Sequence, residues 1–207
     1  MRIKKLERAH KRDHFYLEET DACYYFGEYT PRAGYGHSPT NQAISNLKKS
    51  VTLVGTPQYR WKIESIRDYG ALLNQAFDWG NPNVQDTTWV PVPPSKAKGN
   101  SEYDDRMLQV LYAMSSGRSL DIRDLVYQKN STDSSHLAIG KRPSPQELSV
   151  NYEIDLTLSH PTPKTIAIVD DVLTAGAHFK AMQLVLNRHF PGVMTFGVFL
   201  ARTERSG

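Results

Sequence analysis

One short stretch near the end of the chain limits most strongly how it can fold. Residues 165–179 read TIAIVDDVLTAGAHF, in which an apolar run leads into two adjacent aspartates, a loop of small residues and the start of a helix pattern. A short apolar run of this kind predicts a buried strand of a parallel sheet. Such a strand delivers Asp170 and Asp171 to the sheet edge. The stretch therefore favours an α/β fold with a polar site at the carboxyl ends of its strands.

The loop after the two acids has the composition of a phosphate-binding turn. It consists of Thr174, Ala175, Gly176, Ala177 and His178. Free backbone N–H groups and the helix dipole favour a phosphate at a helix N-terminus, and a glycine allows close approach of the backbone. Acids that take hydroxyl groups beside a loop that takes phosphate suit a sugar phosphate. The alternative is an ordinary strand–turn–helix with capping acids.

A second informative stretch, VPVPPSKAKGNSEYDDRM, covers residues 90–107. Ser95, Lys96 and Lys98 follow a predicted strand that ends in prolines, and Arg106 lies in the next predicted helix. Lysines and backbone N–H groups at the end of a strand can bind a diphosphate. The alternative is a solvated surface loop.

The rest of the chain predicts alternating strands and helices, and hence a mostly parallel sheet covered on both faces. The expected strands are residues 87–94, 120–128, 165–171 and 193–202, and the expected helices are residues 41–49, 60–78, 101–116 and 178–190. Ser38 or Thr40 is expected to cap the first helix. Ile63, Ile66, Tyr69, Leu73 and Phe77 are expected on the inner face of the second. Residues 128–151 are polar and contain prolines, which predicts a long loop.

The N-terminal part predicts a basic arm and a β-hairpin. Residues 1–12 contain six Lys and Arg against one acid. This segment is either a solvated arm or short helix, or an electrostatic contact to nucleic acid or an acidic protein partner. Residues 14–29 are rich in aromatic side chains, which either pack across strands or stack on bases. We expect residues 1–86 to form this N-terminal part, which either belongs to the core or is appended to it, and residues 87–207 to form the core.

The composition narrows the class of protein. The length of 207 residues suits one domain with an appendage, and the net charge of +3 does not by itself imply nucleic acid. Cys23 is the only cysteine, which excludes an internal disulfide and fits a reducing compartment. The sequence contains no apolar run long enough to span a membrane and no apolar core of a secretory signal. These features predict a cytoplasmic protein.

The two motifs together resemble type I phosphoribosyltransferases, which bind 5-phosphoribosyl-1-diphosphate (PRPP). The family signature is four hydrophobic residues, two acids, two hydrophobic residues and Thr-Thr/Ala-Gly-x-Thr/Ser. Residues 166–176 follow it, and His178 departs from the usual hydroxyl residue. The order of PVP, Ser and Lys residues, helix Arg and signature over residues 87–202 is similar to the ComF-like (competence protein F) branch. The zinc finger of that branch is absent, because the chain has one cysteine.

The resemblance implies a type I phosphoribosyltransferase-like fold with an N-terminal hairpin and helical appendage. It implies Mg²⁺-dependent displacement of diphosphate from PRPP by an unknown acceptor, with Mg²⁺ held through the substrate. Asp170 and Asp171 would hold the ribose hydroxyls, and residues 174–178 would hold the 5′-phosphate. The diphosphate would be held by Ser95, Lys96, Lys98 and Arg106.

Several points stay open at the level of sequence. Lys141, Arg142, Gln146 and Asn151 are candidates for a loop that closes over the site. The His178 ring either donates a hydrogen bond to phosphate or faces solvent. The resemblance also allows a non-catalytic regulator that senses nucleotides or PRPP, or an accessory or effector protein in DNA uptake, repair or phage defence. The acceptor and the oligomeric state are open.

Overall fold

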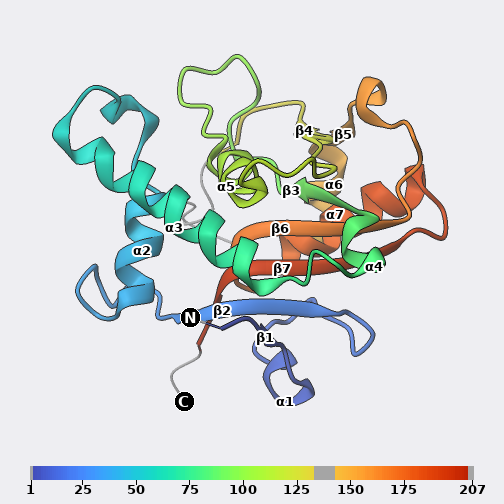
Figure 1. Ribbon diagram of the computed structural model, residues 1–207, viewed down its shortest axis with the longest axis horizontal. Coiled ribbons are helices and arrows are strands. Elements are labelled where there is room, and N and C mark those ends of the chain that lie inside the picture. The colour runs from blue at the N-terminus through green and yellow to red at the C-terminus, as the bar shows by residue number, and fades with distance from the viewer. Residues whose placement is uncertain (1, 133–142, 205–207) are drawn as a thin grey trace.

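A computed structural model describes residues 2–132 and 143–204 and contains a five-stranded central sheet (Figure 1). Its strand order is β1-β2-β7-β6-β3. The strands are β1 (Lys4–Lys5), β2 (Cys23–Tyr29), β3 (Thr87–Pro91), β6 (Thr165–Leu173) and β7 (Met194–Thr203). Only the short β1 is antiparallel to its neighbour, and the other pairs are parallel. The predicted α/β class with a mostly parallel sheet is confirmed.

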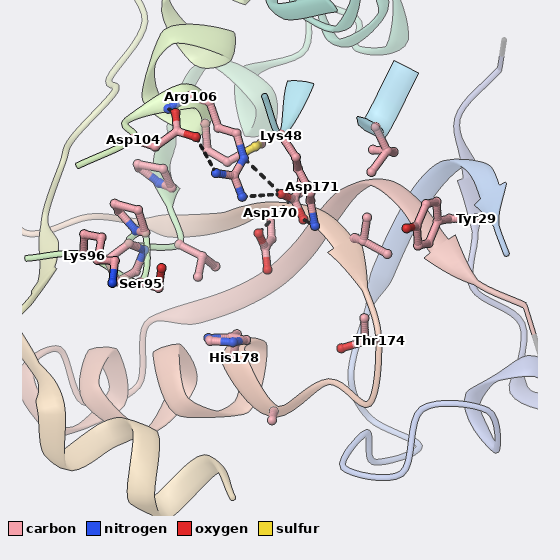
Figure 2. Close-up of a pocket in the computed structure, with 18 of the residues that line it drawn as sticks. Tyr29, Lys48, Ser95, Lys96, Asp104, Arg106, Asp170, Asp171, Thr174 and His178 are labelled. Atoms are coloured by element: carbon pink, nitrogen blue, oxygen red, sulfur yellow. Dashed lines mark hydrogen bonds and ion pairs between the residues drawn. The ribbon is translucent and has the colours of Figure 1, made fainter. Parts of the chain in front are cut away.

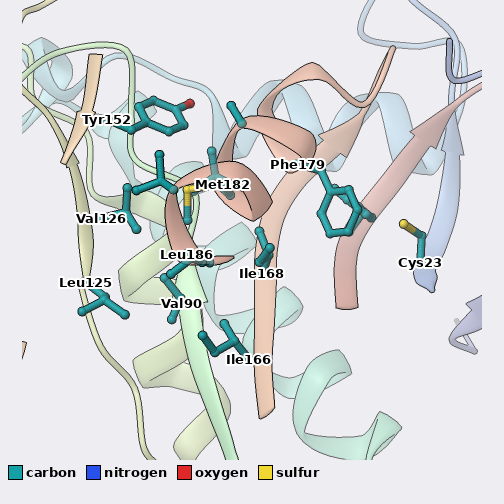
Figure 3. Packing of buried hydrophobic residues seen from close by; sticks show 14 of the residues in the cluster. Cys23, Val90, Leu125, Val126, Tyr152, Ile166, Ile168, Phe179, Met182 and Leu186 are labelled. Atoms are coloured by element: carbon teal, nitrogen blue, oxygen red, sulfur yellow. The ribbon is translucent and has the colours of Figure 1, made fainter. Parts of the chain in front are cut away.

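Helices cover both faces of this sheet. On one face lie α2 (Pro39–Leu47), α3 (Arg60–Ala76) and α5 (Arg106–Ser115), and on the other lie α6 (Pro145–Asn151) and α7 (Ala177–His189). The alternation of strand side chains divides the core accordingly. Ile166 and Ile168 belong to the cluster beneath α7, which Figure 3 shows, whereas Ala167 and Val169 belong to the cluster beneath α3 and α5. β6 is therefore buried on both sides, as its apolar run predicts.

The smaller elements connect this framework. They are the helices α1 (Arg8–Lys11) and α4 (Pro82–Gln85), the 3₁₀ turns Val51–Leu53, Pro57–Tyr59 and Leu156–Leu158, and a two-stranded antiparallel sheet of β4 (Val126–Gln128) and β5 (Tyr152–Ile154). No helix within residues 2–132 and 143–204 is long and apolar enough to cross a membrane.

The predicted helices in the middle of the chain are present. Ser38 caps α2, because its hydroxyl accepts a hydrogen bond from the Asn41 N–H at 3.1 Å. On the predicted inner face of α3, Tyr69 and Leu73 are buried as expected, but Ile63 is 40 % exposed. The helix predicted from residue 101 begins only at Arg106.

The prediction of a β-hairpin over residues 14–29 is wrong. β2 instead pairs in parallel with β7, from the other end of the chain, and antiparallel with β1. Both faces of β2 are buried, because Tyr25 belongs to one core cluster and Phe26 to the other. A strand buried on both faces lies inside a sheet, whereas a hairpin at the edge would leave one face exposed to solvent. The basic segment contains the predicted short helix, but Leu6 anchors it, since its side chain is only 2 % exposed.

Two predictions for the middle of the chain also need correction. Residues 120–128 do not form a strand of the central sheet: Ile122 makes a single bridge to Trp89, and β4 pairs with β5. The loop predicted over residues 128–151 contains α6, which a capping box between Ser144 and Glu147 begins. This Ser-x-x-Glu signal, with a proline at the first helical position, was present in the sequence and was missed.

Candidate functional site

A pocket of about 1360 Å³ lies at the carboxyl ends of the parallel strands (Figure 2). Several separate parts of the chain line it. Ser95 and Lys96 follow β3, the acid pair and most of the loop after it end β6 and begin α7, and Tyr29 and Lys48 come from β2 and the end of α2. Residues of α5 and α6 also contribute. Ligands of open parallel sheets bind at this edge. The pocket therefore combines both sequence motifs with an N-terminal contribution.

Asp171 is held by two cations. Its Oδ1 lies 3.0 Å from Lys48 Nζ, and its Oδ2 accepts hydrogen bonds from Arg106 Nε at 3.1 Å and Arg106 Nη2 at 2.7 Å. The residue is only 5 % exposed. Burial alone would raise its pKa, but Lys48 and Arg106 outweigh burial and hold the pKa of Asp171 well below its usual range. Asp171 is thus an ionised carboxylate whose two oxygens both have cationic partners.

The neighbouring Asp170 has the opposite electrostatic character. Burial and the adjacent charge of Asp171 raise the pKa of Asp170 to about 7. Its Oδ1 accepts a hydrogen bond from the Asp171 N–H at 2.8 Å, and the side chain lines the pocket. Two adjacent acids with separated pKa values are a common arrangement at functional sites. Asp170 is the member of the pair that can gain or lose a proton near neutral pH.

Arg106 lines the pocket, and its side chain is held by two acids. It begins α5, and its guanidinium bridges Asp171 and Asp104, with Nη1 2.8 Å from Asp104 Oδ2. The loop of Ser95 and Lys96 lines the same pocket as Arg106, but the arginine is directed to the acid pair (Figure 2). Sequence reasoning missed Lys48 and Asp104 as site residues. A signal for Lys48 was its position at the end of a predicted helix.

The small-residue loop lies at the pocket, with one exception. Thr174, Ala175, Ala177 and His178 line it. Gly176 has a φ of +84°, and a Cβ added there would lie 2.9 Å from Leu17 Cδ2. The glycine is required by the turn and by its packing against Leu17, rather than by room for a ligand.

The N-terminal segment supports this loop from behind. The Tyr16 N–H donates to the Ala175 carbonyl at 2.9 Å, and His14 Nδ1 contacts the Thr174 carbonyl. His14 is fully buried. These contacts tie residues near the start of the chain to the loop that lines the pocket.

The side chain of His178 lies in the pocket. His178 is the second residue of α7, and its Nδ1 is 2.7 Å from the hydroxyl of Tyr152, which is 4 % exposed. Burial lowers the pKa of His178 and raises the pKa of Tyr152, so both groups are neutral near pH 7. Of the two positions considered for this ring, the structure shows the one at the pocket (Figure 2).

The two lysines of the second motif are separated. Lys96 lines the pocket, with its Nζ 3.8 Å from Glu102 Oε2. Lys98 pairs with Asp124 at 2.7 Å and lines a smaller pocket of about 460 Å³ beside Tyr127. The structure therefore brings Ser95 and Lys96, but not Lys98, to the acid pair.

Of the four candidates for a closing loop, the two that the structure describes do not line the pocket. Lys141 and Arg142 lie outside the described residues. Gln146 and Asn151 belong to α6 and do not line the pocket, whereas Leu148 of the same helix does. Asn151 donates to Gln128 Oε1 at 2.7 Å and to the Asn130 carbonyl at 2.8 Å, which ties α6 to the end of β4.

No protein-family model matches the chain, and no curated protein matches it. The case for a function therefore depends on the residues of the site and on the resemblance of its motifs.

Proposed function

We propose that the protein is a type I phosphoribosyltransferase-like protein that binds PRPP and transfers its phosphoribosyl group. One observation carries the proposal: the acid pair and the loop that opens α7 line the same pocket as Ser95 and Lys96. A sugar phosphate with a second, anionic group is a ligand that matches these three features together.

The parts of PRPP match different parts of the pocket. The loop of residues 174–178 would receive the 5′-phosphate through backbone N–H groups at the start of α7, with the His178 ring beside it. Asp170 would accept a hydrogen bond from a ribose hydroxyl. Asp171, already paired with Lys48 and Arg106, would act by holding its negative charge near the reacting carbon.

The proposed reaction is displacement of diphosphate at ribose C1 by a nucleophilic acceptor. The bond from the acceptor to C1 forms as the bond from C1 to the diphosphate oxygen breaks, and the electron pair leaves with the diphosphate. Lys96 would balance charge on that leaving group. Asp170 and Asp171 would stabilise the positive charge that develops on the ribose.

The residues present fit Mg²⁺ that enters on the substrate. Mg²⁺ bound to the diphosphate and ribose oxygens would neutralise the leaving charge. Asp170, at the pocket wall, would face that complex.

Diphosphate release from labelled PRPP tests the proposal. The protein is incubated with PRPP, Mg²⁺ and pooled nucleobases, nucleosides and nucleic acid, and release is compared with that of Asp170→Asn. Lys164→Met is a matched control, because Lys164 lies on the surface with a side chain 72 % exposed. We expect release by the parent and the control only. Failure of the parent to bind PRPP in calorimetry would contradict the proposal.

A second candidate, a non-catalytic PRPP or nucleotide sensor, is favoured by the pairing of both Asp171 oxygens with cations. In a sensor, a ligand could displace Lys48 or Arg106 and so alter the position of α2 or α5. Tight binding of PRPP, with no release of diphosphate from it in the presence of any acceptor pool, would favour this function over transfer.

A further inference from the structure

Lys62 is a fully buried cation behind the site. It lies on α3, which does not line the pocket, and its side chain is 0 % exposed. Its Nζ is 2.9 Å from the Leu47 carbonyl, 2.8 Å from the Lys49 carbonyl and 2.8 Å from Asp104 Oδ2. An ammonium has three N–H donors, and these three acceptors satisfy all of them.

Each of these contacts leads to one of the cations that hold Asp171. The Leu47 and Lys49 carbonyls flank Lys48, so Lys62 fixes the backbone from which the Lys48 side chain extends. Asp104 is shared between Lys62 and the Arg106 guanidinium, at 2.8 Å from each. One ammonium group is thus connected both to the backbone on either side of Lys48 and to the carboxylate that binds Arg106.

We infer that Lys62 is a positioning residue of the site: from behind the pocket it holds Lys48 and Arg106 on Asp171, and so sets the charge environment of Asp170. A buried amine is costly unless it is paired, and a simple packing role could be filled by an apolar side chain. The inference concerns how the charges are arranged and does not depend on which ligand the pocket takes.

The charged and titratable groups around Asp170 are known from the described residues. Burial and Asp171 raise its pKa, and Lys48 and Arg106 lower it. The His178 ring lines the pocket, and the Tyr152 hydroxyl, whose pKa burial and Asp170 raise, lies 2.7 Å from His178 Nδ1. If the two cations withdraw, the lowering influence weakens. Loss of Lys62 should then raise the pKa of Asp170 further.

The test is a ¹³C NMR titration of the Asp170 carboxyl, assigned with Asp170→Asn, in the full chain. Lys62→Met keeps a long apolar stem and removes the charge, and Arg67→Met is a matched control on the exposed face of the same helix. We expect Lys62→Met to raise the pKa of Asp170 and Arg67→Met to leave it unchanged. A lower melting temperature with an unchanged Asp170 titration would mean a purely structural role and would overturn the inference.

A double-mutant cycle separates positioning from the direct field of the lost charge. A direct field acts equally whether or not Lys48 is present, whereas positioning acts partly through Lys48. We therefore expect Lys62→Met to shift the Asp170 titration less in a Lys48→Met background. Equal shifts in the two backgrounds would overturn the inference.

Asp104→Leu provides an independent variant if Lys62→Met does not fold. Removal of a negative charge would by itself lower the pKa of Asp170, whereas release of Arg106 from its position would raise it. The two explanations thus predict opposite directions. A raised pKa supports positioning through Asp104, and a lowered or unchanged pKa contradicts it.

Discussion

Lys48 Nζ at the end of α2 lies 3.0 Å from Asp171 Oδ1 at the end of β6. This contact joins the N-terminal part of the chain to the signature that first indicated a sugar-phosphate site. Together with the hydrogen bond from the Tyr16 N–H to the loop, it makes the N-terminal part a contributor to the site.

Asp171→Asn should destabilise the fold much more than Asp170→Asn at pH 8. The first change leaves Lys48 and Arg106 facing a neutral amide in a buried setting, and breaking such a pair costs about 3–5 kcal/mol. The second replaces an acid that burial disfavours in its charged form. Denaturant unfolding of both variants measures the difference. Equal losses in the free energy of unfolding would mean that the ion pairs of Asp171 do not stabilise the fold more than Asp170 does.

The free energy of unfolding should fall as the pH rises from about 4 to above 7, because Asp170 loses its proton in the folded protein over this range. Its pKa is raised from 3.8 to about 7, so between these values the folded protein binds a proton that the unfolded chain has lost. That contribution is fully present at low pH and is lost as the pH passes 7. Asp171 stays ionised throughout this window.

Asp170→Asn should remove this slope, because the amide does not titrate. Melting temperatures of the parent and the variant at several pH values test the prediction. Parallel curves across the window would show that Asp170 does not titrate there.

Lys96→Ala should weaken PRPP binding more than ribose 5-phosphate binding, by roughly 1–3 kcal/mol, because only PRPP carries the diphosphate. Lys98→Ala is the matched control, since Lys98 lies at the smaller pocket with Asp124. For each protein, calorimetry measures the affinity for PRPP and for ribose 5-phosphate, each with and without Mg²⁺. Equal effects of the two variants would indicate a general electrostatic attraction instead.

Gly176→Ala should cost more stability than Gly99→Ala. Both glycines have a positive φ, which costs an alanine about 1–2 kcal/mol, but a Cβ at residue 176 also meets Leu17 whereas one at residue 99 meets nothing within 4 Å. Leu17→Ala in the Gly176→Ala background should recover the steric part alone. Denaturant unfolding measures the loss of stability in each variant. Equal losses for the two glycine variants would mean that the Leu17 side chain moves aside without destabilising the fold.

Lys4→Ser with Lys5→Ser should reduce any nucleic-acid affinity and its dependence on salt, while the fold is kept. Both side chains are exposed on the edge strand β1, whereas deletion of residues 2–12 would also remove the buried Leu6. Gel shifts across a salt series measure the effect. No binding by the parent would exclude the basic segment as a nucleic-acid contact.

The amino-acid sequence was sufficient for the features that depend on neighbouring residues. The apolar run before Asp170 predicted a buried strand, the Ser38 cap and the periodicity of α3 predicted helices, and Gly176 marked the turn, because short-range hydrogen bonding and burial patterns govern such elements. The fold class followed from their alternation. The capping box at Ser144 is of the same local kind and could have been read.

Long-range pairing was decided only in the tertiary structure. Nothing near β2 in the sequence shows that it lies beside β7. Likewise, nothing near Lys48 or Arg106 shows that their charges converge on Asp171, and nothing near Lys62 shows that it contacts Asp104. The local pattern of Lys96 and Lys98 made them equivalent, and only the path of the loop separates them. A buried charge must find partners wherever the packed chain brings them, so which acid is held and which faces the pocket is a property of the packing.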